Sequence, residues 1–103
     1  MEEKKKALKA DGKDNVATVF SNGVAVGTAI TTYDKNGTSV EIIAASDVPF
    51  GHKIAVRYIK SGEPIVKYGE IIGDANTDIK TGEYVHIHNM EARRGRGDLE
   101  GKR

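Results

Sequence analysis

The chain has 103 residues, which is the size of one domain with a single core and little room for a buried cofactor. Its formal net charge of +1 gives no strong attraction to nucleic acid or to an anionic membrane, and the absence of cysteine excludes disulfides, thiolate-bound metals and a cysteine nucleophile. No segment is apolar over the roughly 20 residues that a membrane span needs, so we expect a cytoplasmic protein with neither nucleic-acid nor membrane partners.

The two ends of the chain are polar and predict little structure. Residues 1–14 are mostly charged, and we expect them to form a flexible leader. Residues 91–103 place Arg93, Arg94 and Arg96 among glycines and carry too little apolar surface to offset the entropy of ordering. We expect a flexible tail that is solvated or docks on a partner, although its arginines would also suit contacts with phosphates.

Between the ends, short β-prone runs alternate with turn signals, which predicts a mainly all-β domain over residues 15–90. Asn36-Gly37 is typical of a tight hairpin, because both residues tolerate positive φ angles. The runs are rich in β-branched residues, and none of them has a convincing helical period. The predicted strands cover residues 15–20, 24–32, 38–44, 53–59, 64–68 and 84–88.

One turn pattern occurs three times, at residues 48–54, 59–65 and 79–85. Each copy has an apolar residue, two further residues, a glycine, a polar residue, any residue and a second apolar residue. We expect the apolar residues to be buried on both sides of the turn. We expect each glycine to adopt the left-handed conformation, which costs other residues roughly 1–2 kcal/mol.

Three histidines are the side chains best suited to chemistry. His86 and His88 flank Ile87 on a predicted strand, so both rings would share one face while Ile87 faced the core. His52 occupies the polar position of the first turn copy. Three such imidazoles could act as acid–base groups near neutral pH or hold a divalent metal with open positions. Pairs of histidines at this spacing also occur on exposed strands without any function, so the spacing alone leaves both interpretations open.

Several segments together resemble the SAF domain of the altronate/galactarate dehydratase family. The resemblance is carried by Gly51-His52-Lys53, Lys67-Tyr68-Gly69 and His86-Ile87-His88-Asn89, in one order across residues 13–98. It implies a β-clip fold, which is a long, bent sheet folded over on itself. Some members of the family carry this domain at the start of a large hydro-lyase. Others, including the sulfolactate sulfo-lyases, encode it as a separate small subunit.

The implied reaction is a β-elimination from a sugar acid or a similar 2-hydroxy acid, in which hydroxide or sulfite departs. The resemblance implies catalytic roles for His52, His86 and His88, with a divalent metal such as iron(II) bound by His86 and His88. It implies substrate contacts for Lys53 and Asn89. The implied partners are a large catalytic subunit and a small sugar-acid substrate, and homo-oligomer formation by the isolated chain stays open.

The alternative is a non-catalytic β-clip module that binds an acidic sugar or a protein partner. It predicts that the isolated chain binds a ligand and needs no metal to do so.

Overall fold

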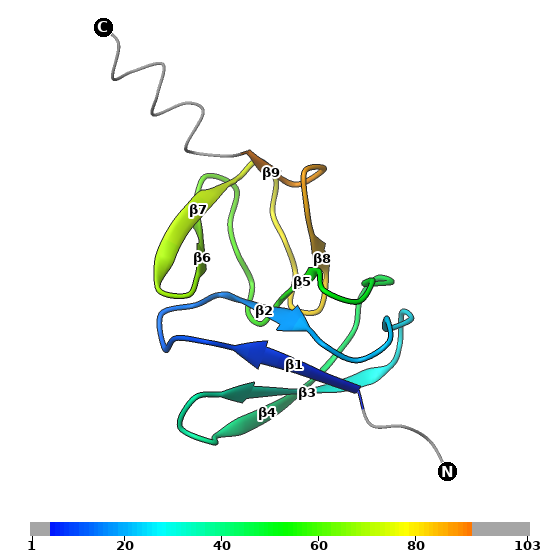
Figure 1. The fold of residues 1–103 in the computed structure, drawn as a ribbon. Coiled ribbons are helices and arrows are strands. Elements are labelled where there is room, and N and C mark those ends of the chain that lie inside the picture. The colour runs from blue at the N-terminus through cyan, green and yellow to red at the C-terminus, as the bar shows by residue number, and fades with distance from the viewer. Residues whose placement is uncertain (1–4, 92–103) are drawn as a thin grey trace, which may run out of the picture.

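The structure is a computed structural model that describes residues 5–91, and every regular element in this part of the chain is a strand. This confirms the all-β prediction, and the curled, folded-over arrangement of the strands agrees with a β-clip (Figure 1). The strands are β1 (Lys5–Lys9), β2 (Val16–Val19), β3 (Ala29–Asp34), β4 (Ser39–Ile43), β5 (Lys53–Ala55), β6 (Pro64–Lys67), β7 (Glu70–Ala75), β8 (Tyr84–Val85) and β9 (Met90–Glu91).

The strands form two sheets. The larger sheet has the order β4-β3-β1-β2-β5-β8, and its β1 and β3 are parallel while the other neighbours are antiparallel. The smaller sheet has the order β6-β7-β9. Figure 1 shows the β6–β7 hairpin standing over β2, so the smaller sheet covers one end of the larger one.

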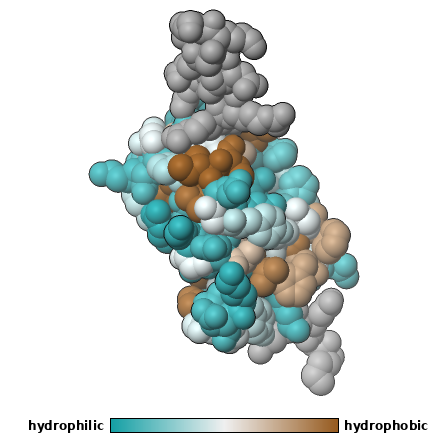
Figure 2. All heavy atoms as spheres, turned by 60° about the vertical axis from the view of Figure 1, so that its left-hand side comes forward, coloured by the Kyte–Doolittle hydropathy of each residue, from teal (hydrophilic) through white to brown (hydrophobic). Residues whose placement is uncertain are grey.

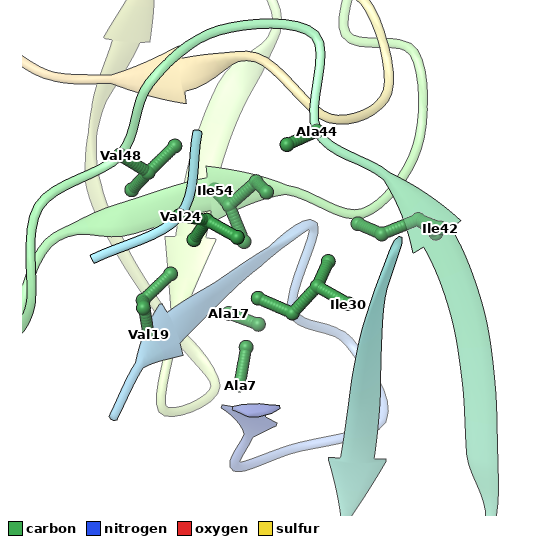
Figure 3. Packing of buried hydrophobic residues seen from close by; sticks show 9 residues of the cluster. All are labelled: Ala7, Ala17, Val19, Val24, Ile30, Ile42, Ala44, Val48 and Ile54. Carbon is green, nitrogen blue, oxygen red and sulfur yellow. The ribbon is translucent and has the colours of Figure 1, made fainter. Parts of the chain in front are cut away.

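Two apolar cores lie on opposite faces of the larger sheet, because successive strand residues point to opposite sides. Along β2, Val16 enters the core shared with the β6–β7 hairpin, whereas Ala17 enters the other core. Along β5, Ile54 and Ala55 divide in the same way. Figure 3 shows the core on the β3–β4 side, with its side chains converging between the strands. That core contains Ala7, Ala17, Val19, Val24, Ile30, Ile42, Ala44, Val48 and Ile54.

The predicted turn conformation is confirmed in all three copies, where Gly51, Gly62 and Gly82 have φ angles of 82°, 93° and 91°. The structure adds a fourth copy at residues 24–30, where Gly27 has a φ of 89°. In every copy the residue after the glycine donates its backbone N–H to the carbonyl three residues earlier. The apolar residue that opens each copy is buried.

The four turns form two similar pairs. In each pair the opening residues are joined by an isolated antiparallel bridge, Val24 with Val48 and Ile59 with Ile79. Each pair is also joined by an aspartate that stands directly before the later turn of the pair. Its carboxylate accepts a backbone N–H from the earlier turn, from the residue just before the glycine. Asp47 does so from Val26 at 2.8 Å, and Asp78 from Ser61 at 2.9 Å. The fold therefore uses the same pair of clamped turns twice.

The expected flexible leader over residues 1–14 is wrong for the described residues, because β1 lies inside the larger sheet between β2 and β3. Only Ala7 of this strand is fully buried, and the lysines around it made the segment look like a solvated end. Backbone pairing on both sides holds β1, and lysine side chains do not prevent such pairing. The predicted tail over residues 92–103 lies outside the described residues.

Two predicted strands end early, the strand predicted over residues 24–32 begins only at Ala29, and β7 and β9 were missed in addition to β1. Strand β5 ends at Ala55 and β8 at Val85, because the turns that follow take the chain out of the sheet. Strand β7 contains Gly73, and a glycine inside a strand weakens the local signal for it. At Gly73 the backbone carbonyl of Glu91 lies where a side chain would begin, so glycine is required for β9 to pair there. Within residues 5–91 there is no helix with the length and apolarity to cross a membrane.

The buried carboxylate of Asp14 holds the β6–β7 hairpin to the loop after β1. Its two oxygens accept the backbone N–H groups of Tyr68 at 2.9 Å and Gly69 at 2.8 Å, and one also accepts that of Asp11 at 3.1 Å. Tyr68 is the one non-glycine residue in the described chain with a positive φ, 56°, so these bonds maintain a strained turn.

We expect Asp14→Ala to lower the free energy of unfolding by about 2–4 kcal/mol, because it leaves partly buried N–H groups without an acceptor. Urea denaturation followed by circular dichroism measures this change. Asp34→Ala is a suitable control, because Asp34 caps a turn whose N–H groups are exposed to water. A loss no larger than that of the control would contradict the structural role of Asp14.

Candidate functional site

Tyr84 is the centre around which the three histidines gather. It lies on β8 opposite Ile54 of β5, and its backbone N–H donates to the hydroxyl of Ser46 at 2.8 Å. Its own hydroxyl lies 2.9 Å from Nδ1 of His52, within hydrogen-bond distance. The strand pairing and this hydrogen bond fix the Tyr84 ring against the turn that precedes β5.

His52 is available for this contact because its own turn does not need its side chain. In the turns at 59–65 and 79–85, a glutamate in the same position accepts the backbone N–H of the turn's second residue. Glu63 accepts that of Lys60 at 2.6 Å, and Glu83 that of Lys80 at 3.0 Å. In the turn of His52 the second residue is Pro49, which has no N–H to donate. The turn is therefore the same in its backbone but leaves its polar side chain free for the site.

His86 and His88 follow β8 on a turn, so the predicted strand over 84–88 is wrong beyond Val85. Ile87 is 77% exposed and does not face the core. The turn is closed by Asn89, whose backbone N–H donates to the carbonyl of His86 at 3.1 Å. The strand ends here because the side chain of Asn89 also binds the backbone, which stabilises the turn over a continued sheet.

Although the strand prediction fails, the turn still brings the imidazoles together. The ring centroids of His52 and His86 are 5.2 Å apart. The Tyr84 ring stacks on His86 at 5.4 Å with an interplanar angle of 10°, and it lies 5.5 Å from His88. Four rings from two turns and one short strand therefore form one cluster, which we call the Tyr84 cluster (His52, Tyr84, His86 and His88).

The charges around the cluster favour a neutral His86. Desolvation of the ring is the largest cause that lowers its pKa below the ordinary 6.5, followed by the charges of His52, Lys53 and His88. The pKa of Lys53 is itself lowered, first by partial burial and then by Lys67. Lys53 and Lys67 are both cationic, so this face of the protein is suited to bind an anion.

The predicted site residue Asn89 has a structural position. It is buried, its side-chain oxygen accepts the N–H of His86 at 2.9 Å, and its amide donates to the carbonyl of Tyr84 at 2.9 Å. These bonds shape the turn that carries both histidines. The substrate contact expected for Asn89 stays a prediction, and its observed effect on the site is to place His86.

A metal ion does not find a complete set of ligands in the described part of the chain. No group of three His, Asp or Glu side chains within residues 5–91 is arranged to hold a metal ion. In addition, Nδ1 of His52 is occupied by the hydroxyl of Tyr84. The metal ligation expected of His86 and His88 therefore could not be completed by these residues alone.

An open hollow of about 380 Å³ lies beside the cluster, and Tyr84 and His88 form part of its wall. Asp78 and Glu83 line it as well. The backbone N–H of Ser61 is the largest cause that holds the pKa of Asp78 below its ordinary value, so this wall stays anionic near neutral pH. The surroundings of Tyr84 thus combine a cationic face with carboxylates that can accept hydrogen bonds from hydroxyl groups.

Tyr84 is the site residue that the sequence analysis missed. Its position in the sequence could have indicated this role. Tyr84 lies two residues before His86, the spacing that places two strand residues on one face, and it directly follows Glu83 of the turn at residues 79–85. Without the strand pairing, nothing in the sequence placed its ring against His52, which lies 32 residues away.

The lowered pKa of His86 can be tested directly. We expect the His86 ring to titrate below 6.5 in an NMR pH titration, and Lys53→Met to raise that pKa because it removes a nearby positive charge. The unfolded chain then binds the proton more readily than the folded one, so the contribution of this group to stability falls as the pH drops through 6.5. Lys35→Met, on the β3–β4 turn, is the control. An unchanged His86 pKa in Lys53→Met would show that the lysine is too distant to act.

Comparison with known proteins places these features in one family. The sequence model of the altronate/galactarate dehydratase SAF domain matches residues 5–93. The chain is 39% identical over 87 residues to altronate dehydratase of Bacillus subtilis (strain 168), a match that covers 84% of this chain but 16% of that protein. It is 34% identical over 86 residues to (2R)-sulfolactate sulfo-lyase subunit alpha of Chromohalobacter salexigens, covering 82% of this chain and 90% of that subunit. The corresponding subunit of Paracoccus pantotrophus is 36% identical over 59 residues, 57% of this chain and 88% of that subunit.

Proposed function

The chain belongs to the altronate/galactarate dehydratase SAF domain family, and on this premise we propose that it acts as the small subunit of a lyase for hydroxy acids. The observation that carries the proposal is the Tyr84 cluster, which groups three imidazoles at an open surface. Residues 5–91 leave the cluster open, and we assign the completion and covering of the site to a second protein.

Two relatives show that a domain of this kind can form a subunit of its own, which supports the proposal. The match spans 90% and 88% of two sulfo-lyase alpha subunits, whereas it spans 16% and 15% of two altronate dehydratases. A domain of this size also has little room for a complete catalytic site of its own. We therefore assign the rest of the catalytic machinery to a large subunit, together with most ligands of any divalent metal, such as iron(II), that the reaction uses.

The chemistry that we assign to the cluster is acid–base catalysis of a β-elimination. A base removes the proton from the carbon next to the substrate carboxylate, a double bond forms, and hydroxide or sulfite leaves the neighbouring carbon. A neutral imidazole near pH 7 is suited to take the proton, which favours His86. The second imidazole of the turn, His88, is exposed and can return a proton to a departing hydroxide.

The surroundings of the cluster suit a hydroxy acid. Lys53 adds a cation on the side of His86, where it would bind the substrate carboxylate. Asp78 and Glu83 in the adjoining hollow would accept hydrogen bonds from substrate hydroxyl groups. A polyhydroxy acid would contact both Lys53 and the carboxylates of the hollow. Sulfolactate is shorter and would rely mainly on Lys53.

The experiment that tests this proposal is reconstitution of the lyase. The full chain, a large lyase subunit from the same genome and the mixture of both are assayed with altronate, galactarate and (2R)-sulfolactate. Formation of a 2-keto acid or release of sulfite is measured. We expect turnover only in the mixture. Equal turnover by the large subunit alone, with sugar-acid binding by the isolated chain in calorimetry, would instead support the non-catalytic binding module.

A further inference from the structure

A second surface feature lies away from the Tyr84 cluster. Leu8, Thr18, Phe20 and Tyr68 line an open, largely apolar hollow of about 290 Å³, which we call the Tyr68 hollow. Leu8 and Thr18 are opposite each other on β1 and β2, and Tyr68 extends from the tip of the β6–β7 hairpin. The hollow is at the lower limit of pockets for small molecules and is wide open, so it is better suited to side chains of another protein.

The apolar side chains of this hollow are well exposed. Tyr68 is 59% exposed, Phe20 49% and Leu8 40%. Figure 2 shows hydrophobic side chains reaching the protein surface in separate areas among hydrophilic ones. Aromatic residues that gather in an open hollow are typical of the centre of a protein interface, where tyrosine often contributes much of the binding energy.

The conformation of Tyr68 supports a role in binding. Its backbone has a φ of 56°, and the buried Asp14 carboxylate holds it there. A glycine at this position would relieve the strain, and the neighbouring Gly69 already has a φ of 76°. Folding therefore does not explain a tyrosine at this position, whereas a partner that contacts its ring does.

Two lysines lie beside the hollow, and one of them links it to the Tyr84 cluster. Nζ of Lys67 lies 5.1 Å from the centre of the Tyr68 ring, and Lys53 is the cross-strand neighbour of Thr18. Lys53 directly follows His52 in the chain, so this lysine is adjacent to the cluster. The backbone N–H of Val19, just before Phe20, also donates to the carbonyl of His52 at 2.9 Å, although Tyr84 packs on the opposite face of β5 from Lys53. A protein seated in the hollow would reach the cluster by extending around β5.

We propose that the Tyr68 hollow is the docking surface for the large subunit, which inserts an apolar side chain flanked by carboxylates between Leu8, Phe20 and Tyr68. This inference rests on the proposed function, since it takes the large subunit as the partner. The apolar floor fits the side chain, and Lys67 beside the Tyr68 ring fits the carboxylates. Docking here places the large subunit next to the histidines that it is to use.

The test measures binding of full-chain variants to the large subunit by calorimetry. Tyr68→Gly removes the ring while keeping a residue that favours the observed backbone, so the variant should fold. We expect its Kd to rise at least about tenfold, with kcat unchanged at saturating subunit concentration. Lys67→Glu should also weaken binding, and its effect should shrink in high salt because it acts through charge. Phe20→Ser provides a second variant of the floor, and Val26→Ser, an exposed apolar residue outside the hollow, is the matched control.

Each outcome decides between the two proposals. If the wild-type chain forms an active complex but Tyr68→Gly and Phe20→Ser bind within about twofold of it, the docking proposal is overturned and the proposed function stands. If the wild-type chain forms no complex and restores no activity, both fail. If sedimentation shows that the isolated chain dimerises and Tyr68→Gly makes it monomeric, the occupant is a second copy and the docking proposal is also overturned.

Discussion

Replacing His86 with alanine is expected to lower kcat of the reconstituted lyase by about 10²–10⁴-fold, while the Kd for the large subunit stays unchanged. His86 belongs to the Tyr84 cluster, where its ring stacks on Tyr84 and its centroid lies 5.2 Å from that of His52. Its neutral imidazole is the base in the proposed elimination, so its loss removes the proton acceptor but none of the docking surface. Initial rates at saturating substrate, with binding measured separately by calorimetry, check both parts of this expectation.

The matched control is Ile87→Ala in the same turn. Ile87 is 77% exposed and does not belong to the cluster, so its replacement should leave kcat within about twofold of wild type. His86→Ala with wild-type kcat would remove His86 from the mechanism. Equal losses in His86→Ala and Ile87→Ala would mean that the turn as a whole is disturbed, and the catalytic role of His86 would then be rejected in favour of a structural one.

Gly82→Ala is expected to have the largest effect on folding, with a loss of about 4 kcal/mol or more in the free energy of unfolding. Gly82 has a φ of 91°, and a Cβ atom there would meet the backbone carbonyl of Ile43 and the backbone nitrogen of Ala45. The nitrogen of Ala45 is held by its hydrogen bond to the carbonyl of Gly82, and Ile43 is held by its pairing with Ala29 of β3. Since this turn immediately precedes β8, the variant should also displace Tyr84.

Gly62→Ala separates the two causes of this loss. Gly62 occupies the same position in a sister turn with a φ of 93°, but a Cβ there would meet nothing within 4 Å. Gly62→Ala should therefore lower the free energy of unfolding only by the roughly 1–2 kcal/mol that the left-handed conformation costs a residue with a side chain. Urea denaturation of both variants gives the difference, which measures the steric conflict at Gly82. Losses of equal size would contradict the close packing of this turn against Ile43.

The turns are the part of the fold that could be predicted best from the sequence. A glycine followed by a polar residue, with apolar residues on either side, describes local geometry, and local geometry depends on neighbouring residues. The fourth copy at residues 24–30 was missed because its glycine is followed by Thr28 and Ala29. In the other copies a histidine or a glutamate follows the glycine and makes the pattern easier to recognise. Asp47 and Asp78 stand at the same position before their turns in the sequence, but their partners Val26 and Ser61 lie in distant segments that no local pattern identifies.

Strand β1 shows where the sequence patterns are insufficient. Its central position in the larger sheet depends on backbone hydrogen bonds to both neighbours, which are independent of side-chain type. The one buried side chain is Ala7, too small to reveal an alternating pattern among lysines. A strand held mainly by its backbone is thus easily mistaken for a solvated leader.

The grouping of the three histidines was predicted from the sequence, but the strand geometry on which that prediction depended is wrong. His86 and His88 were expected to share a strand face with Ile87 turned inward, but a turn carries them and Ile87 points outward. Their convergence with His52 comes from Tyr84, which contacts rings on both sides. The residue types therefore indicated the chemistry, while the arrangement required the pairing of β5 with β8.

The most direct test of the shared site follows the three imidazoles by NMR in the assembled lyase. The chain is labelled with ¹³C at histidine, mixed with the unlabelled large subunit and titrated with substrate or an unreactive hydroxy acid. We predict that the ring signals of His52, His86 and His88 shift with the ligand in the complex and stay unchanged in the isolated chain. If the complex turns over substrate while none of the three signals responds to the ligand, the Tyr84 cluster is not part of the active site.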